Sequence, residues 1–113
     1  MAWRPEEIRD RFKAAAESAR RYAEEVARRP DKSDYDRELQ DAYLAVFRVY
    51  GYFGDEPFLD SREALLSELR RLLAQGPDVF PAEVCNRAVF ARYWRRNIEG
   101  LIERYGREGA ESG

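Results

Sequence analysis

Apolar residues recur at helical spacing in four segments of the chain, and proline or glycine separates each segment from the next. Strand patterns do not occur outside short apolar runs that the helices already explain. In residues 5–28 the apolar positions alternate in steps of four and three, and Arg29-Pro30 ends the run. The spacing predicts an all-α fold. The predicted core positions of this first helix are Ile8, Phe12, Ala15, Ala19, Tyr22 and Val26.

Residues 34–50 are predicted to form a second helix with an unusually wide apolar face. Projected at about 100° per residue, the face covers an arc of about 160° and leaves Leu44 outside. Such a width predicts that the helix lies at the centre of a bundle or is covered by a second subunit. Gly51 is expected to end it, because a helix cap favours a residue that tolerates positive φ. The face comprises Tyr35, Leu39, Ala42, Tyr43, Val46, Phe47, Val49 and Tyr50.

A third helix is predicted at residues 61–75, where leucines form a stripe of normal width. Asp60 is expected to cap its start, with Glu63 placed to complete a capping box. Gly76, followed by proline, is expected to close it, because glycine suits a helix end and proline cannot continue one.

The fourth predicted helix covers about residues 81–105, and Gly106 is its expected end. We expect the first and fourth helices, which are the longest, to be the outer members of the bundle. The whole chain of 113 residues is large enough for one core. The sequence therefore predicts a single four-helix bundle-like domain over residues 1–106 and a short disordered tail over residues 107–113.

The connection between the second and third predicted helices is rich in aromatic residues. It spans residues 51–60, longer than the roughly 2–8 residues usual between bundle helices. Aromatic side chains are common anchors of protein interfaces. We therefore predict that Tyr52, Phe53 and Phe58 bind a partner, unless their rings turn inward and belong to the core.

The fourth predicted helix carries a second apolar stripe, separate from its main face. Cys85, Val89 and Tyr93 follow one another at intervals of four, and Arg92 and Arg96 flank them. Two stripes on one helix predict two neighbours, either two helices of the bundle or one helix and a partner chain. We predict that these five residues bind a partner, with a homodimer as the expected assembly.

Basic residues gather in the last predicted helix, which suggests an alternative. Residues 82–107 carry six arginines against three glutamates, whereas residues 30–81 carry six basic and eleven acidic residues. Within this region Arg92, Tyr93, Trp94, Arg95 and Arg96 interleave charge with aromatic rings. Nucleic-acid binding by this helix is therefore the alternative hypothesis, although the whole chain has a net charge of −2.

The composition excludes several kinds of chemistry. The chain has no histidine and one cysteine, so it lacks the usual zinc and haem ligand sets, Ser-His or Cys-His nucleophiles, and an internal disulfide. The acidic segment at residues 31–36 lacks the glycine and glutamate of an EF-hand loop. We expect no catalytic residue, cofactor or metal, no membrane span, and a cytoplasmic location.

These observations favour a small protein–protein interaction module without catalysis of its own. We expect it to act as a regulatory or accessory subunit, or as an inhibitor, by binding another protein or a second copy of itself.

Overall fold

The computed structural model describes residues 3–54, 57–77 and 80–112, and of residues 108–112 it describes the backbone alone. The predicted all-α, four-helix fold is confirmed in this part of the chain. A single 3₁₀ turn, η1 (Pro57–Leu59), precedes the third helix. The four helices are α1 (Pro5–Ala27), α2 (Asp34–Gly54), α3 (Arg62–Gln75) and α4 (Arg87–Ser112).

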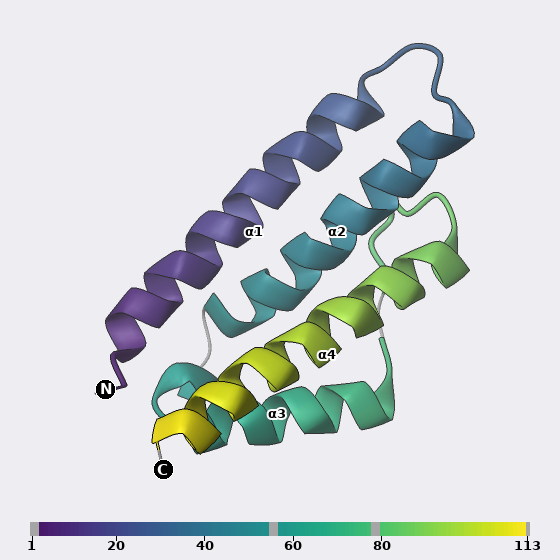
Figure 1. Cartoon of the computed structure of the whole chain (residues 1–113). Coiled ribbons are helices and arrows are strands. Elements are labelled where there is room, and N and C mark those ends of the chain that lie inside the picture. Colours follow the sequence, from purple (N-terminus) through teal and green to yellow (C-terminus); the bar gives the residue numbers. More distant parts are fainter. Residues whose placement is uncertain (1–2, 55–56, 78–79, 113) are drawn as a thin grey trace.

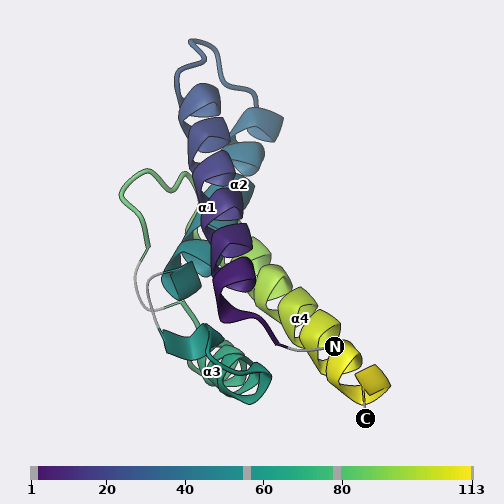
Figure 2. The same ribbon diagram turned by 90° about the vertical axis from the view of Figure 1, so that its left-hand side faces the viewer.

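The helices pack in the spatial order α1, α2, α4, α3. α1 and α2 form an antiparallel pair, and α4 lies on the other side of α2 and runs in roughly the same direction (Figure 1). α3 packs against α4, and the two diverge from the α1–α2 pair at its lower end (Figure 2). The prediction that α2 is central is confirmed, but the outer helices are α1 and α3, not α1 and α4. The molecule measures 50 × 26 × 22 Å.

The core is concentrated where α1, α2 and α4 meet. The ring of Phe12 is fully enclosed and lies 4.9 Å from the ring of Tyr50, 6.0 Å from Phe53 and 6.3 Å from Tyr105, measured between centroids. At the same end the indole of Trp3 donates a hydrogen bond of 2.7 Å to the carbonyl of Leu59. These contacts tie segments from the start, middle and end of the chain into one core.

α1 buries a face rotated slightly from the predicted one. Ile8, Phe12, Ala19 and Val26 are buried as expected, but Ala16 and Ala23 replace Ala15 and Tyr22 as the remaining positions. Tyr22 is half-exposed and stacks its ring on Tyr43 of α2. Alanine therefore occupies the closest part of the α1–α2 contact, and the tyrosine covers its edge.

α2 passes through Gly51 and ends at Gly54, so the predicted helix end is wrong. Among the described glycines Gly76 alone has positive φ, at 85°. A Cβ at Gly51 would lie 3.9 Å from the Cβ of Ala16, an ordinary van der Waals distance, so the contact between α1 and α2 does not require a glycine there. Leu44 is buried, contrary to prediction, and it lies about one turn after Gln40 and Asp41, which bind the segment before α4.

The starts of α3 and α4 also differ from prediction. Ser61, not Asp60, caps α3, and its hydroxyl accepts a hydrogen bond of 3.1 Å from the amide of Ala64. α4 begins at Arg87, several residues later than predicted, after the carboxamide oxygen of Asn86 accepts from the amides of Ala88 and Val89 at 2.9 and 3.2 Å. The start of α4 is therefore set by the side-chain cap of Asn86 and not by the proline at residue 81.

The backbone of α4 continues past Gly106, which we expected to end it, and is helical to Ser112. The side chains of residues 108–112, and residue 113 altogether, lie outside the described part of the chain. Most of the predicted tail falls on these residues.

Candidate functional site

A cleft of about 480 Å³ opens between α2 and α3 and has α4 as its floor. The floor consists of Phe90, Trp94 and Ile98, which share one face of α4. Gly76 and Pro77, at the end of α3, close one side. The lining is mostly apolar: the walls are formed by Phe47, Arg48, Val49, Gly51 and Tyr52 of α2 and by Leu72 of α3.

The cleft lies where α2 and α3 both pack on α4 while their backbones stay apart. In the described ranges no backbone contact joins α2 to α3, whereas α4 contacts both. Phe90 and Ile98 are fully enclosed by this arrangement, while Phe47 and Leu72 stay half-buried on opposite walls. Half-buried apolar side chains facing a recess are typical of a binding surface.

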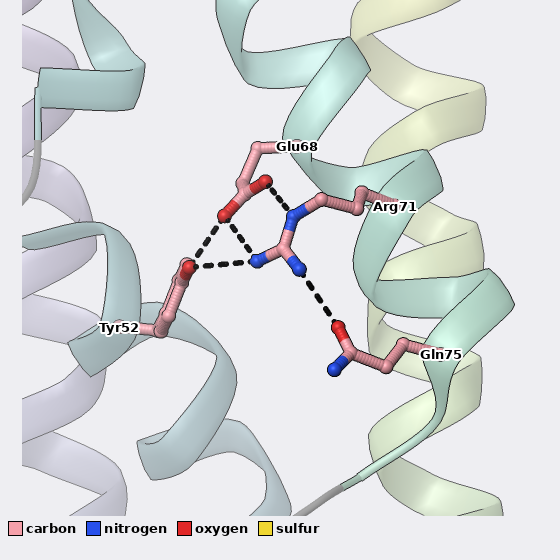
Figure 3. Close-up of polar contacts among 4 residues, drawn as sticks. All are labelled: Tyr52, Glu68, Arg71 and Gln75. Carbon is pink, nitrogen blue, oxygen red and sulfur yellow. Dashed lines mark hydrogen bonds and ion pairs between the residues drawn. The ribbon is translucent and has the colours of Figure 1, made fainter.

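A polar cluster links the two walls. Tyr52 of α2 donates its hydroxyl hydrogen to the carboxylate of Glu68 on α3, and Arg71 holds the same carboxylate through two nitrogens at 2.5 and 2.8 Å (Figure 3). Arg71 also reaches the Tyr52 oxygen at 3.3 Å and the Gln75 carboxamide oxygen at 2.7 Å. The cluster therefore fixes the distance between α2 and α3 where their backbones do not touch.

The ionisation of this cluster favours its observed hydrogen bonds. The guanidinium of Arg71, followed by the hydroxyl of Tyr52, lowers the pKa of Glu68 below its usual range despite burial of the carboxylate. Burial, followed by the hydrogen bond to Glu68, raises the pKa of the Tyr52 hydroxyl. At neutral pH the carboxylate is therefore charged and the phenol is a donor, as the geometry requires.

Arg48 differs from Arg71 in having no such partner. It lies on α2 at the cleft and is exposed. In the described part of the chain no carboxylate forms an ion pair with it. Among the described residues, Arg48 is therefore a positive charge at the cleft without an ion-pair partner.

A second polar cluster fastens α2 to the segment before α4. The carboxylate of Asp41, only 1% exposed, accepts hydrogen bonds from the amides of Cys85 and Asn86 at 2.8 and 2.9 Å. The neighbouring Gln40 donates to the carbonyl of Glu83 at 3.0 Å. The sequence analysis missed this cluster. Its one signal is an aspartate directly before the apolar run of α2, and the backbone amides that it binds are more than forty positions away.

The three aromatic residues predicted to bind a partner have different positions. Phe53 is completely buried in the core and presents no surface. Phe58, in η1, is half-buried and stacks on Tyr52 with centroids 5.9 Å apart. Tyr52, 36% exposed, lies on the cleft wall. The ring of Phe53 therefore turns into the core, and the ring of Tyr52 lies at the cleft. A partner-binding role stays a prediction for Tyr52 and Phe58.

The predicted second stripe of α4 is not continuous. Cys85 lies before the helix, where its amide is bound by Asp41, so it does not share a helical face with Val89 and Tyr93. Desolvation of the sulfur, followed by the Asp41 charge, raises the pKa of the Cys85 thiol. Such a thiol is a poor nucleophile at neutral pH. The homodimer through this stripe stays a prediction.

The arginines of α4 are partly occupied within the chain. Glu38 of α2 accepts hydrogen bonds from Arg92 at 2.7 Å and from the hydroxyl of Tyr93 at 2.8 Å. The guanidinium groups of Arg92 and Arg96 lie over the Tyr93 ring, 5.2 and 5.6 Å from its centroid. Trp94 points the other way, into the cleft floor. Nucleic-acid binding stays a hypothesis, and the Glu38 carboxylate opposes it by compensating charge at that face.

Comparison of the chain with protein-family models, curated proteins and solved structures finds no match. Within the described ranges, no three acidic, cysteine or histidine side chains come together as they do around a metal ion. None of the helices described combines the length and the apolar character that a bilayer span needs.

Proposed function

We propose that the protein is a non-catalytic interaction module that binds another protein by receiving an apolar side-chain anchor in the cleft between α2 and α3. The observation that carries the proposal is the cleft itself. Its volume of about 480 Å³ lies within the roughly 300–1,000 Å³ typical of ligand sites. An accessory subunit or an inhibitor acts in this way, by occupying a partner without chemistry of its own.

The composition of the lining supports an apolar anchor. At the floor Phe90 is fully enclosed and Trp94 is 7% exposed, so the accessible apolar lining comes chiefly from Phe47 and Leu72 on the walls. Binding energy at protein interfaces concentrates in such desolvated pockets, which take one or two large side chains. The hydrogen bond between Tyr52 and Glu68 sets the spacing of the walls before a partner arrives, so no binding free energy is lost in forming the recess.

The test is capture of partners from the native cell by the tagged full chain, with nuclease treatment and mass spectrometry. Two variants change the cleft lining: Phe47→Ala shortens a half-buried side chain on the α2 wall, and Leu72→Trp enlarges one on the α3 wall. Tyr35→Ala, at the far end of α2 and 70% exposed, is the matched control. We expect partners captured by wild type and the control to be lost from both cleft variants.

The purified partner then allows a quantitative check by calorimetry. Loss of a central anchor contact corresponds to at least about a tenfold weaker Kd for Phe47→Ala. A partner that binds both cleft variants as tightly as wild type would overturn the proposal. Partners that disappear on nuclease treatment and are retained by Leu72→Trp would instead favour nucleic-acid binding by α4.

A further inference from the structure

We propose that the segment bound in the cleft carries a carboxylate beside its apolar anchor, and that Arg48 receives it. This inference rests on the proposed function and specifies its partner, an acidic and apolar segment of another protein. The supporting features are the uncompensated charge of Arg48, its place on the cleft wall, and the contrast with the other arginine near the cleft.

Arg71 shows what a satisfied arginine looks like at this site. Its three guanidinium nitrogens are shared among Glu68, Tyr52 and Gln75 (Figure 3). Arg48, in contrast, lines the cleft without an ion pair to any described residue. A guanidinium presents a planar fork of donors that matches a carboxylate. Arg48 is therefore the group available to a ligand, and Arg71 is already used to hold α3.

The cluster between the walls also decides the sign of charge at the cleft. Glu68 is 6% exposed and its charge is neutralised by Arg71, so it adds little repulsion toward an incoming anion. Arg48 is exposed, so a charge pair formed there is partly screened by solvent and its contribution is modest. An aspartate or glutamate beside the anchor gains this pair, and a lysine in the same place meets repulsion.

The net charge of the chain allows the local charge at the cleft to be distinguished from the long-range electrostatic field. At −2 the whole molecule weakly repels acidic ligands and attracts basic ones. A preference for an acidic segment therefore has to come from the local charge at the cleft. If the long-range field decided the outcome, the order of affinities would be reversed.

The experiment uses three peptides with the same apolar residues, Ac-XFXXLX-NH₂, in which every X is glutamate, glutamine or lysine. Binding to the full chain is followed by the indole N–H resonance of Trp94, which lies in the cleft floor. We expect the glutamate peptide to bind about three- to fivefold tighter than the glutamine peptide, as an exposed charge pair allows, and the lysine peptide to bind weakest.

Arg48→Gln should remove the advantage of the glutamate peptide and leave the affinity of the glutamine peptide unchanged. Arg21→Gln, on the exposed side of α1, makes the same change in net charge and should preserve the advantage. Equal binding of the glutamate and glutamine peptides, or an advantage that survives Arg48→Gln, would overturn the carboxylate inference while the cleft proposal stands. If no peptide shifts Trp94, the cleft is not the binding site and both proposals fail.

Discussion

α2 packs directly on α1, but it faces α3 only across the cleft, and these two sides of α2 are built differently. Against α1, small residues such as Ala19 and Ala23 let the backbones come close along most of their length. Toward α3, no backbone contact forms in the described ranges, and Tyr52 and Glu68 bridge the gap. The side of α2 toward α1 is closed by packing, whereas the side toward α3 is bridged by hydrogen bonds between side chains.

The difference teaches where this chain can change without unfolding. A closed face loses free energy with any change of volume, because close-packed atoms have no room to adjust. An open face already contains unfilled space, so its side chains can be altered at little cost to stability. Binding surfaces belong on the second kind of face, and the cleft lies there.

The largest expected effect comes from breaking the closed side at its core. Phe12→Ala should lower the free energy of unfolding by about 3–5 kcal/mol, because it removes a fully buried ring that contacts three other rings. Urea denaturation followed by circular dichroism measures the loss. Tyr35→Ala, on the exposed end of α2, should change it by less than about 0.5 kcal/mol. Similar losses for the two variants would contradict the described core.

The next largest effect concerns the junction between α2 and α4. Asp41→Ala should cost about 2–3 kcal/mol, because the amides of Cys85 and Asn86 lose their acceptor. Chemical denaturation measures the cost, and hydrogen exchange at Cys85 and Asn86 should accelerate at the same time. Glu38→Ala removes a more exposed carboxylate on the same helix and should cost less than about 1 kcal/mol.

Substitution by a larger side chain tests the difference between the closed side and the cleft side directly. Ala23→Leu, on the closed face, should destabilise the protein by about 1–3 kcal/mol through overpacking. Leu72→Trp, at the cleft, should cost less than about 1 kcal/mol because the added atoms enter space that is already open. Thermal unfolding of both variants measures the two losses of stability. Equal destabilisation would mean that the cleft is as tightly packed as the α1 contact.

The smallest effect concerns the bridge between the walls. The folded-state pKa of Glu68 is lowered, so its stabilising contribution is complete above the ordinary value of 4.5 and is lost as the pH falls below it. Glu68→Gln should cost about 1 kcal/mol at pH 7 and less at pH 3, so the difference from wild type narrows in acid. Denaturation curves at the two pH values measure it. If the difference in unfolding free energy between wild type and Glu68→Gln is the same at both pH values, Glu68 does not contribute to the loss of stability in acid.

The helices themselves were largely predictable because their signals are local. The spacing of Ile8, Phe12, Ala19 and Val26 defines α1 without reference to any other segment. Helix ends were less predictable, since capping depends on competing neighbours. Gly51 was interpreted as a helix end, yet it lies inside α2, which continues to Gly54.

The candidate site was not predictable, because it results from the relation of three helices. Phe47, Leu72 and Trp94 each look like ordinary core residues in the sequence. They line a cleft only because α2 and α3 diverge above α4. Tyr52 and Phe53 were both predicted to bind a partner, but Tyr52 is exposed at the cleft whereas Phe53, its neighbour, belongs to the core. Adjacent residues on a helix point about 100° apart, and composition does not show which one turns inward.

The Asp41 carboxylate also bears on the order in which the chain folds. It joins positions separated by 44 and 45 residues, so the chain between them must close into a loop before the hydrogen bonds form. The α1–α2 pair needs only a short connection and can form earlier. The start of α4 is therefore expected to assemble late on an existing hairpin, and substitutions of Asp41 should accelerate unfolding far more than they slow folding.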